Sequence, residues 1–114
     1  PMPGLWRVLA RALTCEELSA DRMGYTIGLL SGLADEVGVP ASAVLEVAGV
    51  SREVADAIRY GTGPLGPVLR AVLAYERNDA AGVARTGVAA VDVYDAYLRG
   101  ATEAMATAQA LGSR

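Results

Sequence analysis

The stretch DRMGYTIGLLSGLADEVG, residues 21–38, decides the fold class of this chain. Asp21 is a typical helix N-cap, and Gly38, followed by Pro40, is a typical helix end. The large apolar residues between them form one stripe at helical spacing and cover a second face as well: Met23, Ile27, Leu30, Ala34 and Val37, then Leu29 and Leu33. Because a helix that is apolar nearly all round belongs in the interior, we expect residues 21–38 at the centre of an all-helical domain.

Three glycines in the same stretch, Gly24, Gly28 and Gly32, recur at every fourth position and therefore share one face of the helix. In a membrane this pattern would indicate a dimerisation face. The longest apolar run, residues 23–34, is too short to span a bilayer and is flanked by charged residues. The pattern therefore predicts a close helix contact inside the domain core and no membrane span.

Working outward, apolar periodicity and Gly, Pro and Asn breakers predict further helices over residues 5–18, 41–47, 51–60, 65–77 and 88–111. Residues 80–87 have weak periodicity and predict one frayed turn. The glycines at 61, 63 and 66 follow a helix and lack the Lys-Ser/Thr ending of a nucleotide loop, so they predict a capping turn. No segment alternates like a strand. We expect one domain, residues 1–114, with an all-α fold: a compact bundle of five to six helices.

The first and last predicted helices each have an apolar stripe. In the first helix we expect an apolar side opposite Arg7 and Arg11, made of Leu5, Val8, Leu9, Ala12 and Cys15. In the last helix the spacing alternates between three and four, and we expect the following residues to pack inward: Val91, Tyr94, Leu98, Ala101, Met105 and Ala108. The alternative is that Tyr94 and Tyr97, with Met105, form a groove for a partner.

Metal and catalytic chemistry have few candidate residues. The chain has no His and one Cys, so a metal site would need carboxylates, and the pairs Glu16-Glu17 and Asp35-Glu36 point to different faces of their helices. Cys15 lies among apolar neighbours with no His as a base, which predicts a buried structural thiol. We therefore expect no enzyme activity, no metal and no cofactor. One Cys also fits a reducing compartment, so we expect a cytoplasmic protein.

The charge pattern argues against nucleic acid as a partner. Net charge is −3, and the ten basic residues, all Arg, are spread along the chain instead of forming a basic segment. Aromatic, apolar and basic residues instead provide candidates for a protein-interaction surface. Its candidate residues are Trp6, Arg59, Tyr60, Tyr94, Tyr97, Leu98 and Met105.

Seven short segments in serial order carry a family resemblance. They are Ala10-Arg11-Ala12, Cys15-Glu16-Glu17-Leu18, YTIGLLS at 25–31, Gly38-Val39-Pro40, Gly63-Pro64-Leu65-Gly66, Ala74-Tyr75-Glu76-Arg77 and Ala96-Tyr97-Leu98. Over residues 5–111 the chain resembles the C-terminal half of an HDOD domain, as found after EAL domains in bacterial cyclic-di-GMP signalling proteins. HDOD domains are similar in fold to HD-type metal phosphohydrolases but lack the full His/Asp metal set, and they are regarded as non-catalytic signalling modules.

The resemblance implies a non-catalytic regulatory or protein-interaction module of a bacterial signal-transduction protein. Because it covers only half of the family domain, it also implies exposed apolar surface and a protein partner. That partner would be an EAL-type domain or a second copy of the chain, in a homodimer formed through the first or the last helix. The alternative from another functional class is a degenerate HD-type phosphohydrolase or nucleotide-binding domain.

Overall fold

The computed structural model describes residues 4–112, and within them all regular secondary structure is helical, without a strand. The all-α prediction is therefore confirmed, while residues 1–3 and 113–114 of the predicted domain lie outside the described part. The helices are α1 (Leu5–Ser19), α2 (Arg22–Val37), α3 (Ala41–Ala48), α4 (Arg52–Tyr60), α5 (Gly66–Glu76), α6 (Ala80–Arg85) and α7 (Ala90–Gly112).

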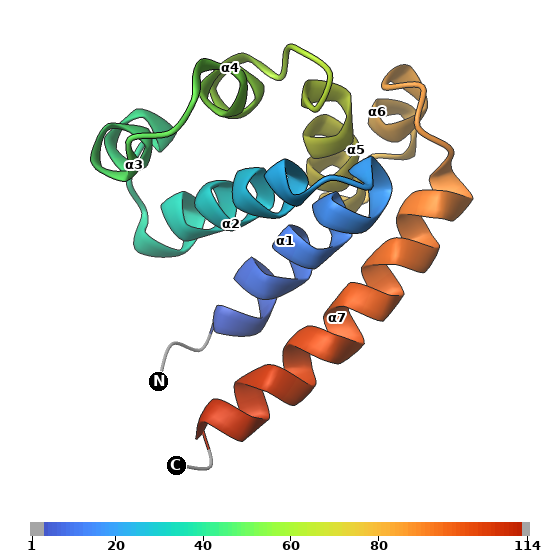
Figure 1. Cartoon of the computed structure of the whole chain (residues 1–114). Helices are drawn as coiled ribbons and strands as arrows, with labels where there is room; N and C mark the ends of the chain where they lie inside the picture. Colours follow the sequence, from blue (N-terminus) through green and yellow to red (C-terminus); the bar gives the residue numbers. More distant parts are fainter. Residues whose placement is uncertain (1–3, 113–114) are drawn as a thin grey trace.

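Helix α1 lies between α2 and α7 (Figure 1). The glycines of α2 allow the first of these contacts. A Cβ atom added at Gly28 would lie 2.7 Å from Cα of Ala12, and one added at Gly32 would lie 3.1 Å from Cα of Val8. Since residue numbers fall along α1 as they rise along α2, the two helices are antiparallel and pack backbone against backbone. The predicted close contact is confirmed.

The second contact, between α1 and α7, also uses small residues. A Cβ atom added at Gly100 would lie 2.9 Å from Oγ1 of Thr14 and 3.2 Å from the carbonyl oxygen of Ala10. The central helix is thus α1 and not the stretch 21–38, whose Val37 is 63% exposed. That expectation was wrong because the glycines, and not the larger apolar residues, make the tightest contact of α2.

The remaining helices complete the core. Helices α3 and α4 pack on α2, and α5 packs on α1, α2, α4, α6 and α7. The main cluster joins α1, α2, α4 and α5 and contains Cys15, Ile27, Val54, Ala57, Leu65, Leu69 and Val72. The predicted caps are present, since Asp21 accepts an N–H group at the start of α2 and Gly38 ends it with positive φ. Ser51 caps α4 in the same way, and Gly49 ends α3 with positive φ. The predicted capping turn is confirmed as well, because Gly61 ends α4 with φ 65°.

The structure has seven helices within residues 4–112, so the prediction of five to six was wrong. The additional helix is α6, where one frayed turn was expected. Asp79 caps it by accepting the N–H of Gly82 at 2.8 Å, and the hydroxyl of Thr86 donates to the carbonyl of Val83 at 2.6 Å. Val83 is the one residue of α6 buried in the core. Because a single buried residue gives no apolar periodicity, the sequence did not predict this helix.

Within the described part of the chain, no helix combines the length and the apolar character that crossing a bilayer requires.

The α1–α2 contact predicts a large effect from one methyl group. Gly28→Ala should lower the free energy of unfolding by about 2 kcal/mol, because the new methyl meets backbone atoms of Arg11 and Ala12 that cannot rotate away. Gly112→Ala, a helical position with nothing within 4 Å, is the matched control and should be neutral or slightly stabilising. Urea denaturation followed by circular dichroism measures both, and equal effects of the two substitutions would contradict the close contact.

Candidate interaction face and adjoining cleft

Most of the large apolar residues of α7 point away from the core, while Val93 and Tyr97 pack toward it. Val91, Tyr94, Leu98 and Met105 are 62%, 51%, 55% and 47% exposed. The expectation that they pack inward was wrong. The buried residues of α7 are instead Val93, Ala96, Gly100 and Ala104. The reason is the short distance between α1 and α7. Because even a Cβ atom added at Gly100 would collide with Oγ1 of Thr14, a Leu or Met side chain does not fit between the two helices there.

We call Val91, Tyr94, Leu98 and Met105 the outer face of α7. Their spacing of three, four and seven residues places them in one row, the arrangement of a helix seam that packs against another helix. Isolated exposed apolar residues are ordinary on protein surfaces, but a continuous row of this length is typical of a contact site. Tyr94 and Met105 are thus exposed, whereas Tyr97, the third residue of the partner-groove alternative, packs against the main core cluster.

The other predicted surface residues fall into two groups. Trp6 and Tyr97 line a cleft beside α7, together with residues of α1, α2 and α5. Arg59 and Tyr60 are exposed at the end of α4, which makes no contact with α7. Five of the seven predicted residues are therefore brought together on or beside α7, and two are not.

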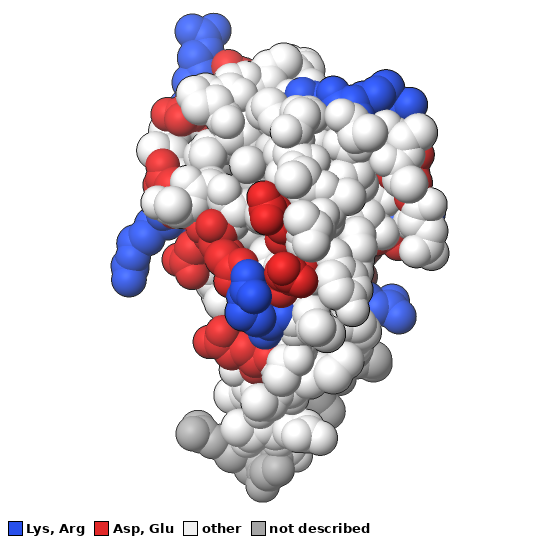
Figure 2. Space-filling model, turned by 90° about the vertical axis from the view of Figure 1, so that its right-hand side faces the viewer, with Lys and Arg blue, Asp and Glu red and all other residues white. Residues whose placement is uncertain are grey.

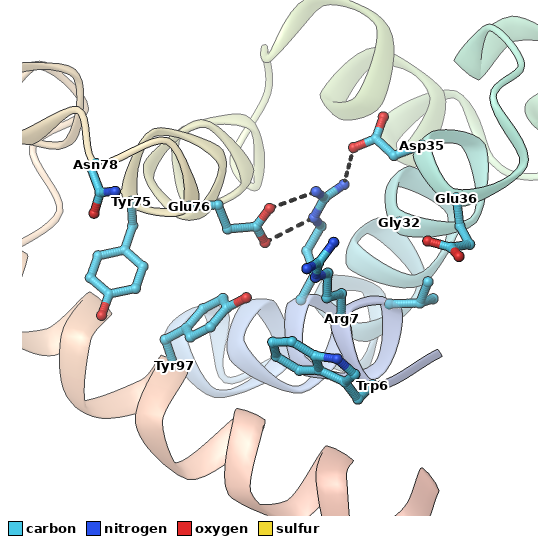
Figure 3. Close-up of a pocket in the computed structure, with 11 residues that line it drawn as sticks. Trp6, Arg7, Gly32, Asp35, Glu36, Tyr75, Glu76, Asn78 and Tyr97 are labelled. Atoms are coloured by element: carbon cyan, nitrogen blue, oxygen red, sulfur yellow. Dashed lines mark hydrogen bonds and ion pairs between the residues drawn. The ribbon is translucent and has the colours of Figure 1, made fainter. Parts of the chain in front are cut away.

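The cleft has a volume of about 580 Å³ and mixes aromatic and charged walls (Figure 3). The rings of Tyr75 and Tyr97 lie 5.2 Å apart at 48°. The guanidinium carbon of Arg7 lies 5.5 Å from the ring centroid of Trp6. Burial, followed by the charge of Glu76, raises the pKa of Tyr97 to about 12, so its hydroxyl stays protonated at neutral pH.

Arg11 lines the cleft and ties three helices together. Its Nε and Nη2 donate to the two carboxylate oxygens of Glu76 on α5, at 3.1 and 2.6 Å. Its Nη1 donates to Oγ of Ser31 at 2.9 Å and to Oδ2 of Asp35 at 2.8 Å, both on α2. Only 8% of Arg11 is exposed. The expectation that Arg11 lies on the polar side of the first helix was wrong. Three polar side chains from two other helices accept hydrogen bonds from its guanidinium group, so that it can be buried.

This arrangement keeps Arg11 charged and occupied. Burial lowers the pKa of its guanidinium, but the hydrogen bonds and charges of Glu76 and Asp35 outweigh burial and raise it above the ordinary value. Each guanidinium nitrogen already donates to a protein oxygen. Arg11 is therefore a structural residue that joins α1, α2 and α5, and four of its five N–H donors are engaged by protein oxygens. This role was not predicted from the sequence. The one local sign of burial was that small apolar residues, Ala10 and Ala12, flank Arg11.

The cysteine prediction is confirmed. Cys15 is free and fully buried, and burial raises the pKa of its thiol to about 12. Within residues 4–112, no three His, Cys, Asp or Glu side chains gather as a metal site would require. The absence of catalytic and metal chemistry remains a prediction.

Neither protein-family models, nor curated proteins, nor solved structures give a match to this chain.

The Arg11 cluster predicts unequal effects from its two carboxylates. Glu76→Gln should lower the free energy of unfolding by about 2–3 kcal/mol, because it removes the charge that holds a buried guanidinium. Asp35→Asn, at a side chain that is 68% exposed, should cost less than about 1 kcal/mol. Thermal and urea unfolding of both variants measure the difference, and a larger loss from Asp35→Asn would contradict the assigned roles.

Cys15 predicts a pH dependence of a known sign. Because the thiol pKa rises from 9.0 to about 12 on folding, the folded state favours the neutral thiol. The stability that results is present in full below the unfolded pKa and is lost as the pH rises from 9.0 toward 12.

Burial of Cys15 also predicts low thiol reactivity. Reaction with Ellman's reagent at about pH 8 should be slow in the folded chain and fast in urea. Fast labelling of the folded chain would show that Cys15 is accessible.

Proposed function

We propose that this chain is a non-catalytic regulatory module that binds a protein partner through the outer face of α7. The observation that carries the proposal is that row of four large apolar side chains, each about half exposed or more. The wider setting, a cytoplasmic signal-transduction protein of bacteria related to cyclic-di-GMP signalling, rests on the resemblance to HDOD domains alone. On that resemblance the partner is an EAL-type domain or a second copy of the chain.

The packing of α1 supports the choice of α7 as the binding helix. The sequence left open whether the first or the last helix meets the partner. Helix α1 contacts α2 on one side, α7 on the other, and also α5, so little of it is left for another molecule. Helix α7 is covered on the side that faces α1, and the side that faces away from the bundle is open to solvent (Figure 1).

The state of the polar groups supports a binding role over a chemical one. The thiol of Cys15 is protonated and buried, and the guanidinium of Arg11 is engaged by Glu76 and Asp35. The cleft carries three carboxylates and two guanidinium groups, from Asp35, Glu36, Glu76, Arg7 and Arg11. This net negative charge opposes entry of a phosphate ester such as a cyclic dinucleotide.

Site-specific cross-linking tests the proposal. A photo-reactive p-benzoylphenylalanine at Leu98 should yield a discrete protein adduct in cells, because the side chain lies in the middle of the outer face. The matched control is the same residue at Val47, an apolar position on α3 that is 91% exposed and lies off this face. Mass spectrometry identifies the adduct.

The two positions decide the result together. An adduct from Leu98 and none from Val47 supports binding through α7. No adduct from Leu98, or the same adducts from both positions, would contradict the proposed function.

A further inference from the structure

One edge of the outer face of α7 is acidic. Asp92, Asp95 and Glu103 follow the side of the helix next to the apolar row, and Asp95 is one helical turn from both Val91 and Leu98. The single cation of α7, Arg99, is already paired with α1: its Nε donates to Oε1 of Glu17 at 2.9 Å, and its Nη2 to the other oxygen.

With Glu17 of α1, this edge has four carboxylates and one guanidinium group, and its net charge is therefore negative. Figure 2 shows acidic side chains gathered around a basic one, with uncharged surface beside them, on this side of the molecule. A shallow hollow of about 240 Å³ lies among them, lined by Glu17, Leu18, Asp92, Asp95 and Arg99. A long side chain that enters it meets carboxylates.

The opposite edge is the aromatic cleft, and it is negative as well. Its carboxylates outnumber its guanidinium groups by three to two. Glu36 forms no ion pair within residues 4–112. The position of Arg7 over the ring of Trp6 shows that this aromatic wall accepts a guanidinium group on its face. A cation from a partner therefore meets both carboxylates and aromatic rings here.

We propose that the partner of the outer face is a basic amphipathic helix, with an apolar stripe on α7 and Lys or Arg side chains directed to both acidic edges. This inference rests on the proposed function and adds the chemistry of the occupant. Charge complementarity is the argument: an apolar row between two negative edges fits a helix of opposite charge. A second copy fits less well, because antiparallel pairing of two α7 helices would bring Asp95 of each copy toward an edge that has no cation to spare.

Fluorescence anisotropy with two labelled synthetic helices tests the inference on the whole chain. Both peptides carry the same Leu and Ala heptad seam, and one has Lys and the other Glu at the flanking positions. The Lys peptide should bind at least about tenfold more tightly than the Glu peptide, and its affinity should fall several-fold between about 0.05 and 0.5 M salt, as screening predicts.

Three variants locate the binding. Leu98→Glu should abolish binding of the Lys peptide, because it places a charge in the apolar row. The double charge reversal Asp92→Arg with Asp95→Arg should weaken binding by about tenfold. Glu46→Arg, at an exposed carboxylate on α3, is the matched control and should leave binding unchanged. Circular dichroism confirms that each variant keeps its helical content.

The possible outcomes separate the two proposals. Equal binding of the two peptides, or no effect of the double reversal, would overturn the basic partner but leave binding through α7 intact. A dimer in light scattering that Leu98→Glu dissociates would make a second copy the occupant and would likewise overturn the basic partner. If the Lys peptide fails to bind and the cross-linker at Leu98 captures nothing, the proposed function itself fails.

Discussion

The close approach of three helix backbones is the constraint on which the rest of the structure depends. Helix α1 meets α2 at Gly28 and α7 at Gly100, and at both positions a single added Cβ would lie less than 3.0 Å from an atom of α1. Small side chains bury little apolar area each, so such contacts stabilise through dense packing. Arg11 then joins the α1–α2 pair to α5 through four hydrogen bonds to Ser31, Asp35 and Glu76.

The same constraint decides which surface remains for a partner. A helix that turns its smallest residues toward a close neighbour has little room there for large apolar side chains, and in α7 the four residues of the outer face point to solvent instead. The charged residues of α7 and the neighbouring cleft give this face two negative edges. Packing therefore accounts for the existence of the binding face, and electrostatics for the kind of partner that it selects.

Local signals in the sequence predicted most of the helices, but contacts between residues far apart in the sequence could not be predicted from it. Caps such as Asp21 and Ser51 act within three residues, so their effect is visible in sequence. The inner face of α7 was missed because a search for hydrophobic stripes ranks Leu98 and Met105 above Gly100. Arg11 was missed because its partners Asp35 and Glu76 lie 24 and 65 residues away. Membership of the HDOD family stays a prediction.

The most direct test of this account compares the free energies of unfolding of Leu98→Asp and Gly100→Leu. If the large residues of α7 face solvent and its small residues face α1, Leu98→Asp should change stability by less than about 0.5 kcal/mol. Gly100→Leu should then cost about 2–3 kcal/mol or more. A severe loss from Leu98→Asp together with a tolerated Gly100→Leu would show that α7 packs through its apolar row, and would contradict the account.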